Sequence, residues 1–221
     1  MDICKKAEQI FEWGIQERGT DKTSDLWVKH SYAAAKVAKT IAKKANLDYN
    51  LAYAMGLLHD IGKYVGHTEV LSTHIVKGYE KMLKENEPEI AKICMTHSFW
   101  PKEKVTELDA KNKIGDLNDT QKIKDFINAT KYNDYDKLIA LADHMSGAHG
   151  ITTIERRFCS ILARHNLKHP QADLIALFEL KSHFDNLCKT NIYELFHDEI
   201  AESPFRGTPG GYYLSHKDKN I

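Results

Sequence analysis

The sequence predicts an all-α protein built as one helical domain with a C-terminal extension. Apolar residues recur every three or four positions along most of the 221 residues, which is the spacing of amphipathic helices. The alternation of apolar and polar residues that marks a half-buried strand is nearly absent. The length suits a single domain with a core that needs no disulfides.

The periodic pattern predicts helices from the N-terminus onward. The first is expected over residues 3–18, and the second begins at Ser24 or Asp25, since either residue suits a helix N-cap. The third is expected over residues 50–60, with Gly62 as its C-terminal signal. Further helices are expected over residues 68–85, 88–97, 135–146, 150–165 and 171–188.

Two stretches break the helical pattern. Residues 98–134 are charged and rich in Asn and Asp, with a short helix expected over residues 119–130. We interpret this stretch as a solvated surface excursion; the alternative is a lid over a site, because long connections within compact domains are often functional. The tail from Ser203 is too rich in Gly and Pro for a helix.

Composition excludes several classes of partner and environment. Lys plus Arg and Asp plus Glu both total 31, and this neutral balance argues against a broad basic surface for nucleic acid or acidic membranes. The longest apolar run, Leu51–Leu58, is too short to span a membrane, and no signal peptide is visible. We therefore expect a cytoplasmic protein, in which scattered cysteines stay reduced. These are Cys4, Cys94, Cys159 and Cys188.

Histidines raise the question of a metal site. The chain has 12 of them, and four lie on the predicted apolar stripes of four different helices. One buried histidine is usually a core residue whose ring nitrogens have hydrogen-bond partners. Four buried histidines on separate helices are hard to supply with partners independently, and a shared metal centre would bind all four. The four are His30, His59, His74 and His97.

Two aspartates accompany these histidines. Asp60 follows His59 directly at a helix end, and Asp143 follows the apolar run Leu138–Ala142. An aspartate at such a position is either a helix-end residue or a metal ligand, and the first alternative is the more common one.

The segment Leu57-Leu58-His59-Asp60-Ile61-Gly62-Lys63, with His30 before it and Asp143 after it, resembles the HD-domain superfamily of metal-dependent phosphohydrolases. The superfamily pattern is a lone His, a His-Asp doublet and a distant Asp. The resemblance covers about residues 24–150, which we take as the HD-domain core. Residues 1–23 are expected to form a helix packed on that core, and residues 151–221 to add helices and a Gly/Pro tail to the same domain.

A finer resemblance involves two further histidines. Thr73-His74-Ile75-Val76-Lys77-Gly78-Tyr79 and Thr96-His97-Ser98 are similar to the two-metal HD subgroups, which include bacterial hydrolases of diadenosine tetraphosphate. The segment between His97 and Asp143 is longer than in those hydrolases, which leaves the substrate open. The resemblance implies a first metal held by His30, His59, Asp60 and Asp143, and a second held by Asp60, His74 and His97.

The implied chemistry defines the other candidate residues. Histidine and aspartate ligands suit one or two ions of iron, manganese, zinc or nickel better than magnesium. We expect Asp60 and Lys63 to be catalytic, with Lys63 either reaching a phosphoryl oxygen or standing as a solvated surface lysine. Arg156 and Arg206 are candidate substrate-binding residues, and Arg157 beside Arg156 could also hold a phosphate. The alternatives are a solvated helix face for the paired arginines and a free tail for Arg206.

The expected function is metal-dependent hydrolysis of a phosphomonoester or phosphoanhydride, with a small phosphorylated substrate, a nucleotide above all, and activated water. Neither a nucleic-acid polymer nor a membrane is expected as a partner, and a homodimer is left open. Two alternatives belong to other classes. One is an HD-type di-iron oxygenase acting on a small polyol or phosphonate, and the other is a non-catalytic nucleotide-binding regulator, which an incomplete ligand set would favour.

Overall fold

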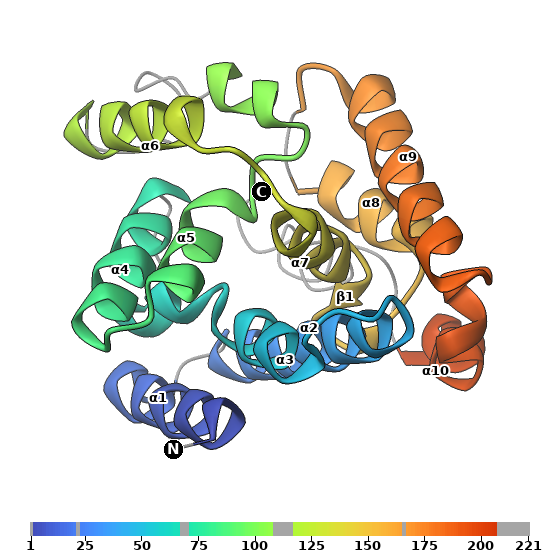
Figure 1. Ribbon diagram of the computed structural model, residues 1–221, viewed down its shortest axis with the longest axis horizontal. Coiled ribbons are helices and arrows are strands. Elements are labelled where there is room, and N and C mark those ends of the chain that lie inside the picture. The colour runs from blue at the N-terminus through green and yellow to red at the C-terminus, as the bar shows by residue number, and fades with distance from the viewer. Residues whose placement is uncertain (1, 21–22, 67–70, 108–116, 165–166, 207–221) are drawn as a thin grey trace, which may run out of the picture.

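The computed structural model describes residues 2–20, 23–66, 71–107, 117–164 and 167–206, and it confirms the all-α fold (Figure 1). In these residues the strands are two short segments, β1 (Ser146–Gly147) and β2 (Gly150–Ile151), which pair antiparallel with Ser146 opposite Ile151. The α-helices are α1 (Ile3–Arg18), α2 (Ser24–Lys44), α3 (Tyr49–Leu58), α4 (Leu71–Lys84), α5 (Pro88–Thr96), α6 (Leu117–Ala129), α7 (Asp134–His144), α8 (Ile154–Leu162), α9 (Pro170–Cys188) and α10 (His197–Glu202). Short 3-10 helices are η1 (Ile61–Val65), η2 (Lys102–Glu107), η4 (Ile192–Phe196) and η5 (Ser203–Arg206).

Side-chain caps fix where several helices begin. The Asp48 carboxylate accepts hydrogen bonds from the backbone N–H groups of Asn50 and Leu51 at the start of α3. Asn133 and Asp136 form a capping box at the start of α7. The expected cap of α2 was wrong by one residue, because Thr23 occupies the N-cap position without a side-chain hydrogen bond.

The main core is formed by helices that lie side by side. α2 packs along α3, α4 packs along α5, and α7 runs through the middle of the molecule between these pairs and α8–α9 (Figure 1). α1 packs against α3 and η1. Fully buried side chains from α1, α2, α3, α5 and α9 fill the space between them: Phe11, Ile41, Leu57, Leu58, Ile90 and Phe184.

The stretch 98–134 is more than the solvated excursion expected from its composition. The expected short helix is present as α6, and Ile123 and Ile127 of this helix are fully buried. They form a second cluster with apolar residues of α4, α5 and η2, among them Ile75 and Met95. In the described part of this stretch, α6 therefore packs over α4 and α5, as Figure 1 shows.

Gly62 has a different role from the expected helix end. α3 already ends at Leu58, and Gly62 lies inside η1. A Cβ atom at Gly62 would overlap the carbonyl oxygen of His74 and lie 2.5 Å from the backbone nitrogen of Gly78. The missing side chain thus lets the backbone of η1 approach α4 closely, which sets the distance between the His-Asp doublet and His74.

The C-terminal region adds helices to the core. Residues 203–206 form η5, whereas no helix was expected from Ser203 onward, and the Thr152 hydroxyl donates to that of Ser203 (3.5 Å). The rest of the Gly/Pro tail lies outside the described residues. Among the residues that the structure describes, no helix has the length and apolar character needed to cross a membrane.

Candidate metal centre

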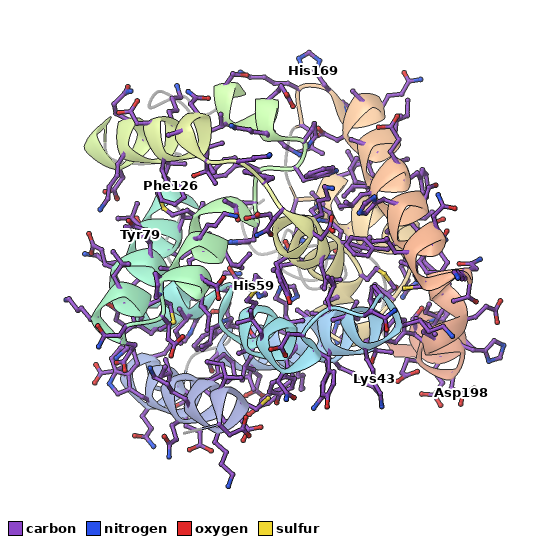
Figure 2. All side chains as sticks on the ribbon, in the orientation of Figure 1. Lys43, His59, Tyr79, Phe126, His169 and Asp198 are labelled. Atoms are coloured by element: carbon purple, nitrogen blue, oxygen red, sulfur yellow. The ribbon has the colours of Figure 1, made fainter. Side chains whose placement is uncertain are left out.

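The structure brings the six predicted ligand residues together in the middle of the molecule. They come from α2, from the end of α3 and the residue after it, from α4, from the end of α5 and from α7. Figure 2 shows His59 at this central position, close to α5 and α7. All four histidines and Asp60 are buried, as their positions on the apolar stripes predict.

Helix ends position two of the histidines. His59 is the C-cap residue of α3, and His97 is the C-cap residue of α5. Nδ1 of His59 contacts the carbonyl oxygen of Gly56 (2.7 Å), and Nδ1 of His97 contacts those of Ile93 and Cys94 (3.1 and 3.0 Å). A proton on Nδ1 satisfies these carbonyls and leaves Nε2 of each ring as a bare acceptor. The negative ends of both helix dipoles face the centre, which favours a cation there.

His30 is held by the β-hairpin rather than by its own helix. Its Nδ1 lies 3.0 Å from the carbonyl oxygen of Ser146 in β1. Its Nε2 consequently points into the centre, 3.2 Å from Nε2 of His59 and 3.1 Å from Oδ1 of Asp143. The loop after α7 therefore orients a ligand residue of α2.

The two carboxylate oxygens of Asp60 face different pairs of histidines. Oδ2 lies 3.4 Å from Nε2 of His59 and 3.7 Å from Nε2 of His30. Oδ1 lies 3.3 Å from Nε2 of His74 and 3.5 Å from Nε2 of His97. Two groups of ligand atoms, each within 4.8 Å of one another, thus share this one carboxylate.

The charge states of the carboxylates and of two histidines suit metal ligands, whereas Asp60 outweighs burial and raises the pKa of His59. Burial lowers the pKa of His30 to about 4, although Asp143 opposes this, and burial also lowers the pKa of His74. Burial alone would raise the pKa of Asp60, but Lys63 and His59 hold it well below its usual range. His30 likewise outweighs burial and keeps the pKa of Asp143 low. Neutral imidazoles and charged carboxylates are the forms that bind divalent metals.

The hydrogen bonds of His30 and His59 indicate that their Nε2 atoms suit a metal ion. Nδ1 of His30 and Nδ1 of His59 both face carbonyl oxygens, and Nε2 of the two rings face each other across 3.2 Å. If both rings are neutral, neither Nε2 has a proton to donate, and a cation between them makes the approach favourable. The alternative is a proton on His59, whose pKa Asp60 raises against the effect of burial. The histidine and aspartate donors of this group are able to bind metal.

The other predicted site residues lie at different distances from the centre. Lys63 Nζ forms an ion pair with Asp60 Oδ2, and its side chain is 35% exposed, so it stands at the rim of the centre. Arg156 lies in α8, but it is the second arginine of the pair, Arg157, that contacts Asp143 (Nη2 to Oδ1, 3.7 Å). The prediction for Arg206 concerns a side chain outside the described part of the chain.

A buried network around Asp136 ties two ligand helices together. Its carboxylate accepts hydrogen bonds from the Thr96 hydroxyl (2.9 Å) and the backbone N–H of Asn133 (2.7 Å), and it pairs with Lys92. Thr96 precedes His97 at the end of α5, and Asp136 lies two turns before Asp143 on α7. The network fixes the position of α5 relative to α7.

Replacing Asp136 by alanine is expected to lower the free energy of unfolding by about 3 kcal/mol, because Lys92 and Thr96 lose a buried charged partner. Urea denaturation of the metal-free protein measures this. Asp134→Ala, in the same first turn but 41% exposed, is the matched control and should cost less than about 1 kcal/mol. Equal losses in the two variants would contradict the role of the network.

Comparison with known proteins gives the family. Residues 27–148 match the family model of the HD domain. The chain is 32% identical to Ribonuclease Y of Mycoplasma capricolum subsp. capricolum over 137 residues, which cover 51% of this chain and 27% of that protein. It is 33% identical to Ribonuclease Y of Campylobacter hominis over 123 residues, which cover 43% of this chain and 24% of that protein. The chain thus matches about a quarter of the length of these relatives.

No solved structure matches the chain. The family match and the ribonuclease relatives indicate a metal-dependent hydrolase, which confirms the enzyme class predicted from the sequence. The matched segment contains every one of the six residues that converge in the centre. The chain belongs to the HD-domain family.

Proposed function

We propose that this protein hydrolyses a phosphate ester or phosphoanhydride of a nucleotide-containing substrate at the centre described above. The observation that carries the proposal is the shared carboxylate of Asp60, with one oxygen toward His30 and His59 and the other toward His74 and His97. Divalent ions held by these histidines and aspartates would supply a site for the phosphate, a lower pKa for a water molecule and stabilisation of charge on the attacking and leaving oxygens.

The protein's own residues hold the reaction in place. His30, His59, Asp60 and Asp143 are the proposed first ligand group, and Asp60, His74 and His97 the second. Water adds to phosphorus, the bond to the leaving oxygen breaks, and a proton passes to that oxygen. Lys63 stands at the rim, where its ammonium group can neutralise charge on a phosphoryl oxygen.

RNA is a second candidate substrate, and the relatives favour it. Proteins named Ribonuclease Y share about a third of the aligned residues with this chain. We therefore do not retain the expectation that nucleic-acid polymers are excluded as partners. The neutral charge balance still argues against a broad basic surface, so an RNA strand would be held mainly at the centre itself.

The proposal predicts that a chelator abolishes hydrolysis and that a divalent transition metal restores it. The test uses a panel of nucleoside monophosphates, diphosphates, dinucleotides and single-stranded RNA, with phosphate or product release measured after treatment with EDTA and again after addition of manganese, iron, zinc or nickel. Release from any member in a metal-dependent manner supports hydrolysis, and the member hydrolysed fastest assigns the substrate class.

Two further outcomes separate the alternatives. Oxygen uptake with reduced iron and a small polyol or phosphonate, without phosphate release from the panel, would instead assign an oxygenase. Nucleotide binding without any turnover would assign a regulator. Oxygen uptake without phosphate release contradicts hydrolysis directly. Nucleotide binding without turnover contradicts hydrolysis when both ligand groups of the protein are loaded with metal.

A further inference from the structure

Arg157 is a largely buried cation whose Nε lacks a hydrogen bond in the described part of the chain. Its side chain is only 16% exposed. The nearest carboxylate contact is from Nη2 to Oδ1 of Asp143 at 3.7 Å, beyond the length of a hydrogen bond. Its Nε is buried and has no hydrogen-bond partner among the described residues.

Such an arrangement is costly without a further partner. A guanidinium carries five N–H donors in a planar fork, and burying them unsatisfied costs free energy. Nε2 of His30 lies closer to Oδ1 of Asp143, at 3.1 Å, than Arg157 does. A ligand that presents two oxygen acceptors in one plane would satisfy the fork, and phosphate is such a ligand.

The fold explains why Arg157, and not Arg156, reaches the centre. α8 buries Ile154 and Phe158 against the core. Arg157 lies three residues after Ile154 and one before Phe158, so it stands at the edge of the buried face, whereas Arg156 lies on the opposite side of the helix. Thr153 caps α8 and fixes its start directly after the β-hairpin that holds His30.

A purely structural role for Arg157 would consist of orienting Asp143. Its distance from that carboxylate argues against this, because an orienting arginine makes two parallel hydrogen bonds of about 2.8 Å.

We propose that Arg157 forms an anion subsite that binds the phosphate oxygens of the substrate beside the first ligand group. The substrate would then carry a phosphate group held between Arg157, which lies beside Asp143, and Lys63, which pairs with Asp60. This inference rests on the proposed hydrolytic function, but phosphate binding can be measured apart from turnover.

The test measures binding of inorganic phosphate to the manganese-loaded full chain by isothermal titration calorimetry. Arg157→Gln is expected to weaken phosphate binding about 10- to 100-fold, the effect of losing a charge-assisted hydrogen bond. Arg157→Lys keeps the charge but not the fork and should recover part of the affinity. Arg156→Gln, the matched control, should bind phosphate within about twofold of the wild type.

Turnover gives a second readout. With bis(p-nitrophenyl) phosphate, Arg157→Ala is expected to show a raised KM, and added methylguanidinium should restore activity, which a merely structural residue would not allow. Unchanged phosphate binding in Arg157→Gln, or a loss of bound manganese from that variant, overturns the subsite while the hydrolytic function stands. A wild type that binds phosphate through Arg157 but hydrolyses no substrate overturns the function and supports the subsite.

Discussion

Replacing Asp60 by alanine is expected to reduce hydrolysis by about a thousandfold while leaving a folded helical protein. The reason is the position of its carboxylate, which faces His30 and His59 with one oxygen and His74 and His97 with the other. Its loss removes a donor from both proposed ligand groups at once. Initial rates on the best substrate of the panel, together with far-UV circular dichroism, measure the effect.

The matched control for this variant is Asp198→Ala, an aspartate in α10 whose side chain is 94% exposed (Figure 2). It should keep the activity and stability of the wild type. Full activity in purified Asp60→Ala would refute the assignment of this carboxylate to the reaction. A second variant, His30→Ala, should also lose activity, because it removes a donor from the first group.

Replacing Gly62 by alanine is expected to lower the free energy of unfolding by about 3 kcal/mol and to disturb the second ligand group. The added methyl would overlap the His74 carbonyl and the backbone of Gly78, and neither is the end of a flexible side chain that can move aside. α4 must then shift away from η1, and His74 moves away from Asp60. Urea denaturation of the metal-free protein and metal analysis after loading with manganese measure the two effects.

Gly147→Ala provides the comparison for this variant. A Cβ atom at Gly147 would meet its nearest neighbour, the carbonyl oxygen of Gly150, at 3.6 Å, which is ordinary contact. This variant should change the free energy of unfolding by less than about 0.5 kcal/mol. If Gly62→Ala were equally stable and bound as much manganese as the wild type, the close packing of η1 on α4 would not position His74.

Much of this architecture could be predicted from local sequence. The helices α1, α2 and α9 have apolar residues at regular helical spacing, and the expected ranges agree with the observed ones within a few residues. The burial of His30 and His97 also followed from their places on the apolar stripes of α2 and α5. The convergence of the six residues did not follow from periodicity, and only the resemblance to the HD pattern indicated it.

The errors concern contacts between segments far apart in the sequence. Ile123 and Ile127 stand among charged and amide side chains, and nothing in that stretch indicates the partners Ile75 and Met95 that bury them. Gly62 looked like a helix-end glycine because its close neighbour, the backbone of α4, cannot be seen locally. A composition-based interpretation therefore understated how much of residues 98–134 is packed.

The choice between Arg156 and Arg157 could not be made from the sequence. Both were candidates for holding a phosphate, and paired arginines are usually solvated. Choosing between them required the face of α8 that the core covers, which the burial of Ile154 and Phe158 shows.

The number of metal ions bound per chain tests the central claim most directly. After loading with manganese and removal of free metal, elemental analysis should find two ions per chain in the wild type, one in His74→Ala and fewer than one in Asp60→Ala. These values follow from two ligand groups that share Asp60. Equal metal content in the wild type and Asp60→Ala would contradict the shared carboxylate and, with it, the proposed reaction.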